Sequence, residues 1–167
     1  MAFNADEVFT IAERIEEDAA EFYTKAANLH AAQEEVELLR RLARMENEHR
    51  DRLVEMRNDL TPAMSRYLDD FPHPKAMLYL TTIADAHGGE GSLSQAQPLT
   101  ASDTLEDLLK KGIDFEQKTI LFYTALKDMV PPDLGREQVD RIIEEEKQHF
   151  LDLTARLKNL QAQSRGS

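Results

Sequence analysis

The stretch EEDAAEFYT at residues 16–24 recurs one hundred residues later as EQKTILFYT at residues 116–124. The same offset relates ENEH at 46–49 to EKQH at 146–149. Apolar matches alone could reflect the periodicity that any two helices share. In each half, a glutamate is followed seven residues later by a tyrosine and thirty residues later by the glutamate of an E-x-x-H motif. Such a polar pattern is much harder to repeat by chance. The chain therefore contains an internal repeat that carries polar as well as apolar residues.

Each half of the repeat predicts a helical hairpin. Apolar residues recur at helical spacing in four segments, which are 5–29, 33–59, 104–128 and 136–160. The joins within the halves are short, and the second contains Pro131 and Pro132. Thr104 with Asp107 is typical of a capped helix start, and Asn4 with Glu7 is the matching pair in the first half.

A segment of different composition separates the two hairpins. Residues 61–101 contain four prolines and the run GGEGS, which indicates a connection with one short helix over 76–86. Such a connection can run back along a helix of about 25 residues, which is roughly 37 Å long. The sequence therefore predicts an all-α four-helix bundle in which hairpins 5–60 and 104–160 are joined by one long crossover. We expect a single domain over 1–160 and a disordered tail over 161–167.

The composition excludes several classes of function. Charged residues make up 31% of the chain and the formal net charge is −12, so nucleic acid and anionic membranes are not expected as partners. The chain has no cysteine, which excludes disulfides, iron–sulfur clusters and cysteine-bound zinc within this sequence. No secretory signal and no apolar stretch approaching about 18 residues is present. We therefore expect a cytoplasmic protein.

Six of the repeated residues are predicted to converge. Two residues of an antiparallel hairpin lie level when they are equally far from the turn. The midpoint of Glu16 and Glu46 is residue 31, and the midpoint of Glu116 and Glu146 is residue 131. Both midpoints fall in the predicted turns. The spacing i,i+3 places each histidine on the same helix face as its glutamate. If the hairpins pack with their turns at the same level, four carboxylates and two imidazoles meet, namely Glu16, Glu46, His49, Glu116, Glu146 and His149.

Such a cluster predicts a metal site. Four buried carboxylates without a counter-charge would be strongly destabilising, and two metal ions would supply that charge. Carboxylates with imidazoles suit Fe, Mn or Zn. A single E-x-x-H is usually part of a solvated helix face, but two such motifs in register with two further glutamates favour a site. The other nearby acids are expected to face solvent, namely Glu17, Glu34, Glu35, Glu144 and Glu145.

These motifs resemble those of the rubrerythrin branch of the ferritin-like superfamily of di-iron carboxylate proteins. The resemblance covers both hairpins and rests on E-x5-F-Y, which begins at Glu16 and at Glu116, and on the two E-x-x-H motifs. It implies two Fe ions per chain, with Mn or Zn as alternatives. It further implies bridging by Glu46 and Glu146, terminal ligation by Glu16 and Glu116, one ion each for His49 and His149, and hydrogen-bond donation to ligands by Tyr23 and Tyr123.

The chain departs from typical rubrerythrins in two respects. Those proteins carry a rubredoxin-like module with cysteine-bound iron, so this chain requires an external electron donor, either rubredoxin-like or a reductase. They also carry an extra ligand glutamate one turn from the third-helix glutamate, where this chain has Ile113, Thr119 and Ile120. Glu13 or Glu17 is an alternative source of an extra carboxylate.

Three functions are compatible with this reading. The first is an enzyme in which an Fe²⁺ pair reduces H₂O₂ or O₂. The second is an iron-handling protein that oxidises Fe²⁺ and passes Fe³⁺ to storage. The third is a helical interaction module whose metal is structural. The resemblance favours the first, a di-iron oxidoreductase, and implies a homodimer or a larger homo-oligomer.

Overall fold

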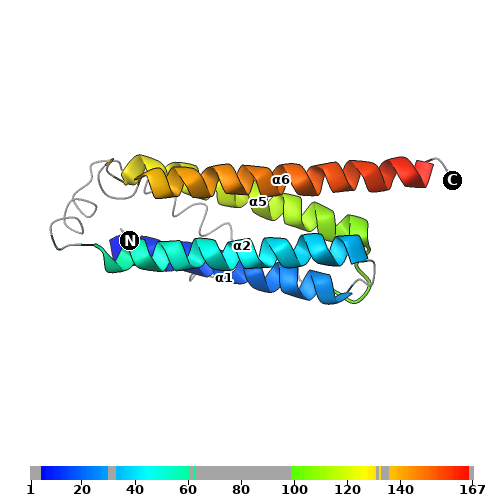
Figure 1. Ribbon diagram of the computed structural model, residues 1–167, viewed down its shortest axis with the longest axis horizontal. Coiled ribbons are helices and arrows are strands. Elements are labelled where there is room, and N and C mark those ends of the chain that lie inside the picture. The colour runs from blue at the N-terminus through cyan, green and yellow to red at the C-terminus, as the bar shows by residue number, and fades with distance from the viewer. Residues whose placement is uncertain are drawn as a thin grey trace.

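Four helices make up the part of the chain that the structure describes. In this computed structural model the described residues are 5–29, 33–60, 62, 99–130, 132 and 136–165. The helices are α1 (Ala5–Leu29), α2 (Gln33–Asn58), α5 (Leu105–Met129) and α6 (Arg136–Arg165). No strand occurs in these ranges, so the predicted all-α class is confirmed (Figure 1). Most of the predicted crossover, its proposed helix at 76–86 and the cap residue Asn4 lie outside the described residues.

The two hairpins point in opposite directions. Figure 1 shows that α1 ends and α2 begins at one end of the bundle, whereas α5 ends and α6 begins at the other. Val8, near the start of α1, accordingly shares a cluster with Leu126, near the end of α5. Our assumption that the turns lie at the same level is therefore wrong. The hairpins are instead related by an approximate twofold axis perpendicular to the helices, with the end of α2 and the start of α5 at opposite ends of the bundle.

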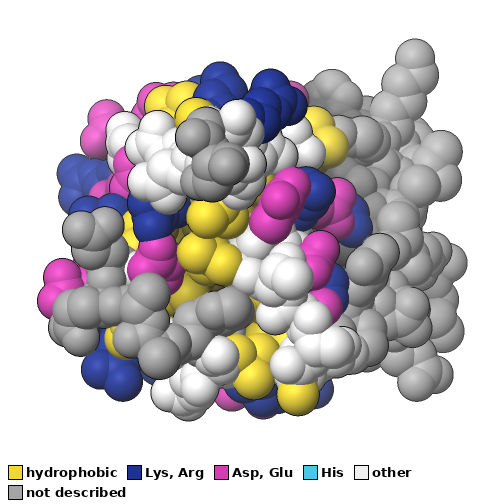
Figure 2. Space-filling view, turned by 90° about the vertical axis from the view of Figure 1, so that its right-hand side faces the viewer, with side chains coloured by type: hydrophobic (Ala, Val, Ile, Leu, Met, Phe, Trp, Pro, Cys, Tyr) yellow, Lys and Arg dark blue, Asp and Glu magenta, His cyan; other side chains and the backbone are white. Residues whose placement is uncertain are grey.

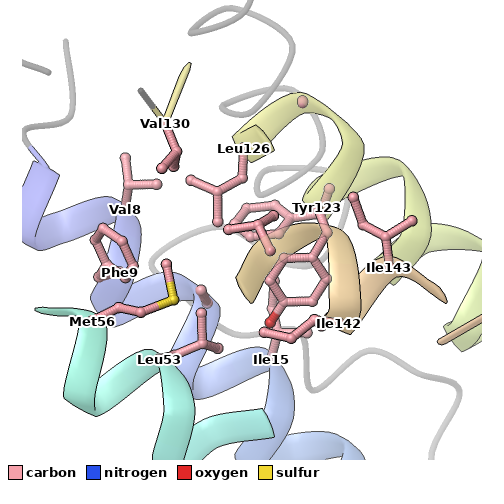
Figure 3. Close-up of a cluster of buried hydrophobic side chains, with 14 of the residues drawn as sticks. Val8, Phe9, Ile15, Leu53, Met56, Tyr123, Leu126, Val130, Ile142 and Ile143 are labelled. Atoms are coloured by element: carbon pink, nitrogen blue, oxygen red, sulfur yellow. The ribbon is translucent and has the colours of Figure 1, made fainter. Parts of the chain in front are cut away.

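Two apolar clusters fill the bundle, one toward each end. The first joins the start of α1 and α6 to the end of α2 and α5 (Figure 3), and includes Val8, Phe9, Leu53, Met56, Leu126, Val139 and Ile142. The second joins the opposite halves of the helices, and includes Phe22, Ala26, Leu39, Leu42, Leu108, Leu109 and Leu153. Each fully buried side chain of this size contributes about 1.5–3 kcal/mol. Seen from the end nearest the C-terminus, apolar side chains lie in the middle and charged ones around them (Figure 2).

The repeat extends from the sequence to the burial of side chains. Every residue of 11–19 is buried, half-buried or exposed in the same way as its counterpart in 111–119. The same holds for 41–54 and 141–154. The two hairpins therefore turn equivalent faces toward the interior, which brings equivalent polar residues to the middle of the bundle.

The last helix is longer than expected. α6 continues to Arg165, so the prediction of a disordered tail is wrong for 161–165. Gln161 donates a hydrogen bond from Nε2 to Oε1 of Glu106 over 2.9 Å, which ties this end of α6 to the first turn of α5. Among the described helices, none is long and apolar enough to cross a membrane.

The predicted start of α5 is confirmed in detail. The N–H of Asp107 donates to Oγ1 of Thr104 over 3.2 Å, and the N–H of Thr104 donates to Oδ2 of Asp107 over 2.9 Å. This reciprocal arrangement is a capping box, which satisfies two backbone donors that the helix itself cannot.

Replacing Thr104 with alanine should therefore destabilise the protein. Loss of an N-cap side chain costs about 1 kcal/mol, and the free energy of unfolding in urea, measured with a chelator present, reports it. Thr104→Ser keeps the hydroxyl and is expected to retain most of the stability. Equal stability of the alanine variant and the unaltered protein would show that the capping box contributes nothing.

Candidate metal centre

The six residues predicted to converge lie together near the middle of the bundle. α1 contributes Glu16 and α5 contributes Glu116, while α2 and α6 each contribute a glutamate and a histidine from one face. All six side chains are almost completely shielded from solvent, with exposed fractions of at most 1%. Charged residues are rarely buried to this degree unless something compensates them.

The cluster divides into two overlapping groups of four residues. One group is Glu16, Glu46, His49 and Glu146, and the other is Glu46, Glu116, Glu146 and His149. Within each group, one nitrogen or oxygen atom from each residue lies within 4.8 Å of the others. Because Glu46 and Glu146 belong to both groups, the arrangement offers two neighbouring cation positions that share two carboxylates.

The shared carboxylates divide their oxygens between the two histidines. Nδ1 of His49 lies 3.2 Å from Oε2 of Glu46 and 2.9 Å from Oε1 of Glu146. Nδ1 of His149 lies 3.0 Å from the other oxygen of each, Oε1 of Glu46 and Oε2 of Glu146. The two imidazole rings stack with their centroids 5.6 Å apart. Each shared carboxylate thus presents one oxygen to each side, as a bridge between two ions requires.

Many of these buried atoms lack an aligned hydrogen bond. Among the described residues, the atoms without a partner include Oε2 of Glu16, both carboxylate oxygens of Glu46 and Glu146, and Nδ1 of both histidines. The short separations between them therefore reflect convergence on common points rather than paired donors and acceptors. Each buried polar group left unsatisfied costs about 1–3 kcal/mol. A cation at each point would satisfy these atoms together, so the residues fit a pair of metal ions.

The pKa values of the cluster show where protons reside when no metal compensates the charge. Burial, reinforced by the nearby Glu146 carboxylate, raises the pKa of Glu16 and of Glu116 well above the usual carboxyl value. Burial also disfavours the charged form of His149, but the close carboxylates of Glu146 and Glu46 outweigh it and raise the pKa of His149 to about 9. Metal ions must therefore displace protons from this site.

Two buried tyrosines link the hairpins at the site. The hydroxyl of Tyr23, on α1, donates to Oε1 of Glu116 on α5. The hydroxyl of Tyr123, on α5, donates to Oε1 of Glu16 on α1. Both tyrosines are completely buried. Each tyrosine therefore orients a glutamate of the opposite hairpin, rather than the glutamate two turns away on its own helix.

A glycine makes room for one of these tyrosines. A Cβ atom on Gly112 would lie 3.2 Å from Cδ1 of Leu153 and 3.4 Å from Cε1 of Tyr23. Glycine inside a helix costs about 1 kcal/mol relative to alanine, so this position favours close packing over helix propensity. The matching position in the first half of the repeat is Ala12, so the two halves of the repeat differ in this packing.

Two acids that we expected to face solvent do not. Glu35 is buried and forms an ion pair with Arg156. Glu145 is half-buried, and its Oε2 lies 2.7 Å from Nε2 of His49 and 2.9 Å from Nη1 of Arg52. The repeat contained a signal for Glu145, because the matching residue is the apolar Met45, which indicates a partly interior position.

The alternative sources of an extra carboxylate stay outside the cluster. Glu13 pairs with Arg57, whose Nη1 lies 3.2 Å from Oε2 of the glutamate, and Glu17 is exposed. Thr119 is buried one turn from Glu116, but its hydroxyl donates to the backbone carbonyl of Phe115 over 3.1 Å. Neither Glu13 nor Glu17 belongs to either group of four.

Comparison with known proteins supports the fold. No family profile and no curated protein matches the chain. A solved structure from Thermotoga maritima is similar over 95% of this chain and 97% of that one, with a TM-score of 0.72 and 21% sequence identity. That protein is described, provisionally, as a ferritin-like diiron-carboxylate protein. The predicted ferritin-like four-helix bundle is thereby confirmed, whereas the rubrerythrin branch stays a prediction.

The proton load of the site predicts a pH-dependent gain in stability from metal. The raised pKa values of Glu16 and Glu116 stabilise the metal-free protein below their unfolded values, near 4.5, and this contribution is lost as the pH rises through the folded values. The contribution of His149 is likewise present below 6.5 and lost toward about 9. Metal-free protein should therefore lose stability as the pH rises from about 5 to about 8, where metal binds more tightly.

Melting temperatures with Mn²⁺ and with chelator at both pH values measure this difference. At a thousandfold excess over the dissociation constant, metal adds about 4 kcal/mol to the free energy of unfolding. The increment should be larger at the higher pH. An equal increment at both pH values would contradict the proton displacement.

Proposed function

We propose that this ferritin-like bundle is a non-haem di-iron oxidoreductase that reduces hydrogen peroxide, with O₂ as the alternative oxidant. The observation that supports it most directly is the pair of overlapping ligand groups that share Glu46 and Glu146. A structural site for one ion needs no such sharing. Two adjacent metal ions can together deliver two electrons to one small oxidant, or can act on both of its atoms.

The six residues form three pairs in this proposal. Glu46 and Glu146 would be the residues that the two ions share, since each directs one oxygen toward each histidine. His49 with Glu16 completes one position, and His149 with Glu116 completes the other. The ligands are carboxylates and imidazoles without sulfur, a set that suits iron or manganese and also accepts zinc.

In this proposal the metal would supply the redox chemistry. The chain would hold the ligands in place and exclude water from the site. Two Fe²⁺ ions held by these residues would supply the two electrons that the reduction of H₂O₂, with two protons, to two molecules of water requires. Tyr23 and Tyr123 hold the terminal glutamates across the hairpin interface. The apolar clusters on either side keep bulk water from the cluster. This sequence contains no cysteine, so the proposal includes a rubredoxin-like protein or a reductase as the donor that returns the electrons.

The shared and unshared glutamates should differ in the number of ions that they control. Glu146→Ala removes a proposed bridge and is expected to lose both ions, whereas Glu16→Ala should weaken only one. Elemental analysis of iron-loaded, desalted protein measures the difference, and the exposed Glu17→Ala is the matched control. Glu146→Gln preserves the shape of the side chain in case the alanine variant folds poorly. Two retained ions in both Glu146 variants would rule out the bridging role.

The proposed reaction is tested by mixing anaerobic Fe²⁺ protein with H₂O₂ in a stopped-flow spectrophotometer. We expect one rapid oxidation of the pair, which then stalls until a reductant is added. A parallel experiment uses equimolar O₂. Faster oxidation by O₂, with iron accumulating beyond two ions per chain, would replace the peroxidase proposal with iron storage. Metal that responds to neither oxidant would indicate a structural site.

A further inference from the structure

The two halves of the site match at every proposed ligand but differ behind the histidines. Nε2 of His49, the nitrogen that faces away from the shared carboxylates, lies 2.7 Å from Oε2 of Glu145. Nη1 of Arg52 donates to that same oxygen over 2.9 Å. In the other half, Nε2 of His149 is buried and has no hydrogen-bond partner among the described residues. Among the described residues, Nε2 of His49 therefore has a hydrogen-bond partner and Nε2 of His149 has none.

The sequence explains why the contact occurs once. The residue that matches Glu145 in the repeat is Met45, and the residue that matches Arg52 is Asp152. A thioether cannot replace a carboxylate as a strong acceptor for an imidazole N–H. Asp152 is engaged elsewhere, with its Oδ2 2.7 Å from Nη2 of Arg41. In the described part of the chain, the pair of Glu145 and Arg52 beside His49 therefore has no equivalent beside His149.

We propose that the two metal positions are unequal, and that Glu145 is a positioning residue that makes the His49 position the stronger one. This inference rests on the proposed function only in requiring that the site binds two ions. Donation from Nε2–H to Glu145 places the proton of His49 on Nε2, so that the lone pair of Nδ1 faces the carboxylates. A carboxylate that accepts a hydrogen bond from one nitrogen of a ligating imidazole also makes the other nitrogen more basic and a stronger metal ligand.

Arg52 keeps Glu145 in place for this role. Glu145 and Arg52 are both about one-quarter exposed, with side-chain exposed fractions of 28% and 27%. An exposed glutamate without a partner would populate several rotamers, and the charge-assisted contact restricts it to the one that reaches His49. Since Glu145 is on α6 and His49 on α2, the contact also crosses between the hairpins.

The inequality has a measurable consequence for the order of loading. The first equivalent of a divalent ion should occupy the His49 position, and the second should bind His149 more weakly. Removing a partner of this kind from a ligating histidine typically lowers metal affinity about 10–100-fold. The same range is expected between the two positions in the unaltered protein.

Calorimetric titration of the full-length, metal-free protein with Co²⁺ tests the proposal. Two classes of affinity are expected for the unaltered protein. Glu145→Met gives the second half the residue that the first half has, and should weaken the stronger class about 10–100-fold while leaving the weaker class unchanged. Glu145→Gln, which retains an acceptor oxygen without the charge, should fall between the two. Glu144→Met is the matched control, because Glu144 is exposed and, in the part of the chain that the structure describes, forms an ion pair with Lys147.

Proton NMR of the Co²⁺-loaded protein gives a readout that a general loss of stability would not produce. The unaltered protein should show one slowly exchanging, hyperfine-shifted imidazole N–H, from His49, and this signal should disappear in Glu145→Met. Equal affinities in the unaltered protein, or equal weakening of both classes by Glu145→Met, would overturn the proposal. Two unequal classes in a protein that fails to react with peroxide or O₂ would leave the inference standing and refute the proposed redox function.

Discussion

Four carboxylates and two imidazoles buried in an apolar interior form the constraint on which the rest of this bundle depends. Every one of these side chains comes from the middle of a long helix, so none can withdraw to solvent without unwinding its helix. The charges must therefore be compensated where they are, by protons or by metal. The pKa values of Glu16, Glu116 and His149 are raised. Protons therefore occupy these groups at pH values at which the same groups in water would have lost them. Metal ions at the site would compensate the same charges and would satisfy the unpaired atoms as well.

The opposite directions of the two hairpins determine how this cluster is held. With the turns at opposite ends, α1 and α5 run antiparallel, and residues seven positions beyond Glu16 and Glu116 extend toward different ends of the bundle. Tyr23 and Tyr123 can then each reach the glutamate of the other hairpin. Glu145 and Arg52 add a further contact between hairpins, from α6 to α2. Polar groups around the site therefore fasten the hairpins to each other, while the apolar clusters fill the space above and below.

Local patterns in the sequence predicted the four helices and the six residues that lie together at the centre. Helical periodicity placed all four helices to within a few residues, and Thr104 with Asp107 identified the start of α5. The repeat identified the six residues that meet at the centre. Relative direction was not predictable in this way, because a hairpin that is level within itself can pack in either orientation. The roles of Glu35 and Glu145 were also missed, since each pairs with a residue on a distant helix, and local charge runs contain no information about such pairing.

Carrying both halves in one polypeptide has a consequence for how such a centre can change. If two separate copies of one hairpin assembled around the same axis, every substitution would appear twice, and the two sides would remain identical. Here the positions that match across the repeat are encoded independently, so Glu145 can stand on one side while Met45 stands on the other. Glycine can likewise occupy position 112 while alanine occupies position 12. In a fused repeat, different residues can therefore lie beside two otherwise matching groups of side chains. A symmetric assembly of identical hairpins cannot differ in this way.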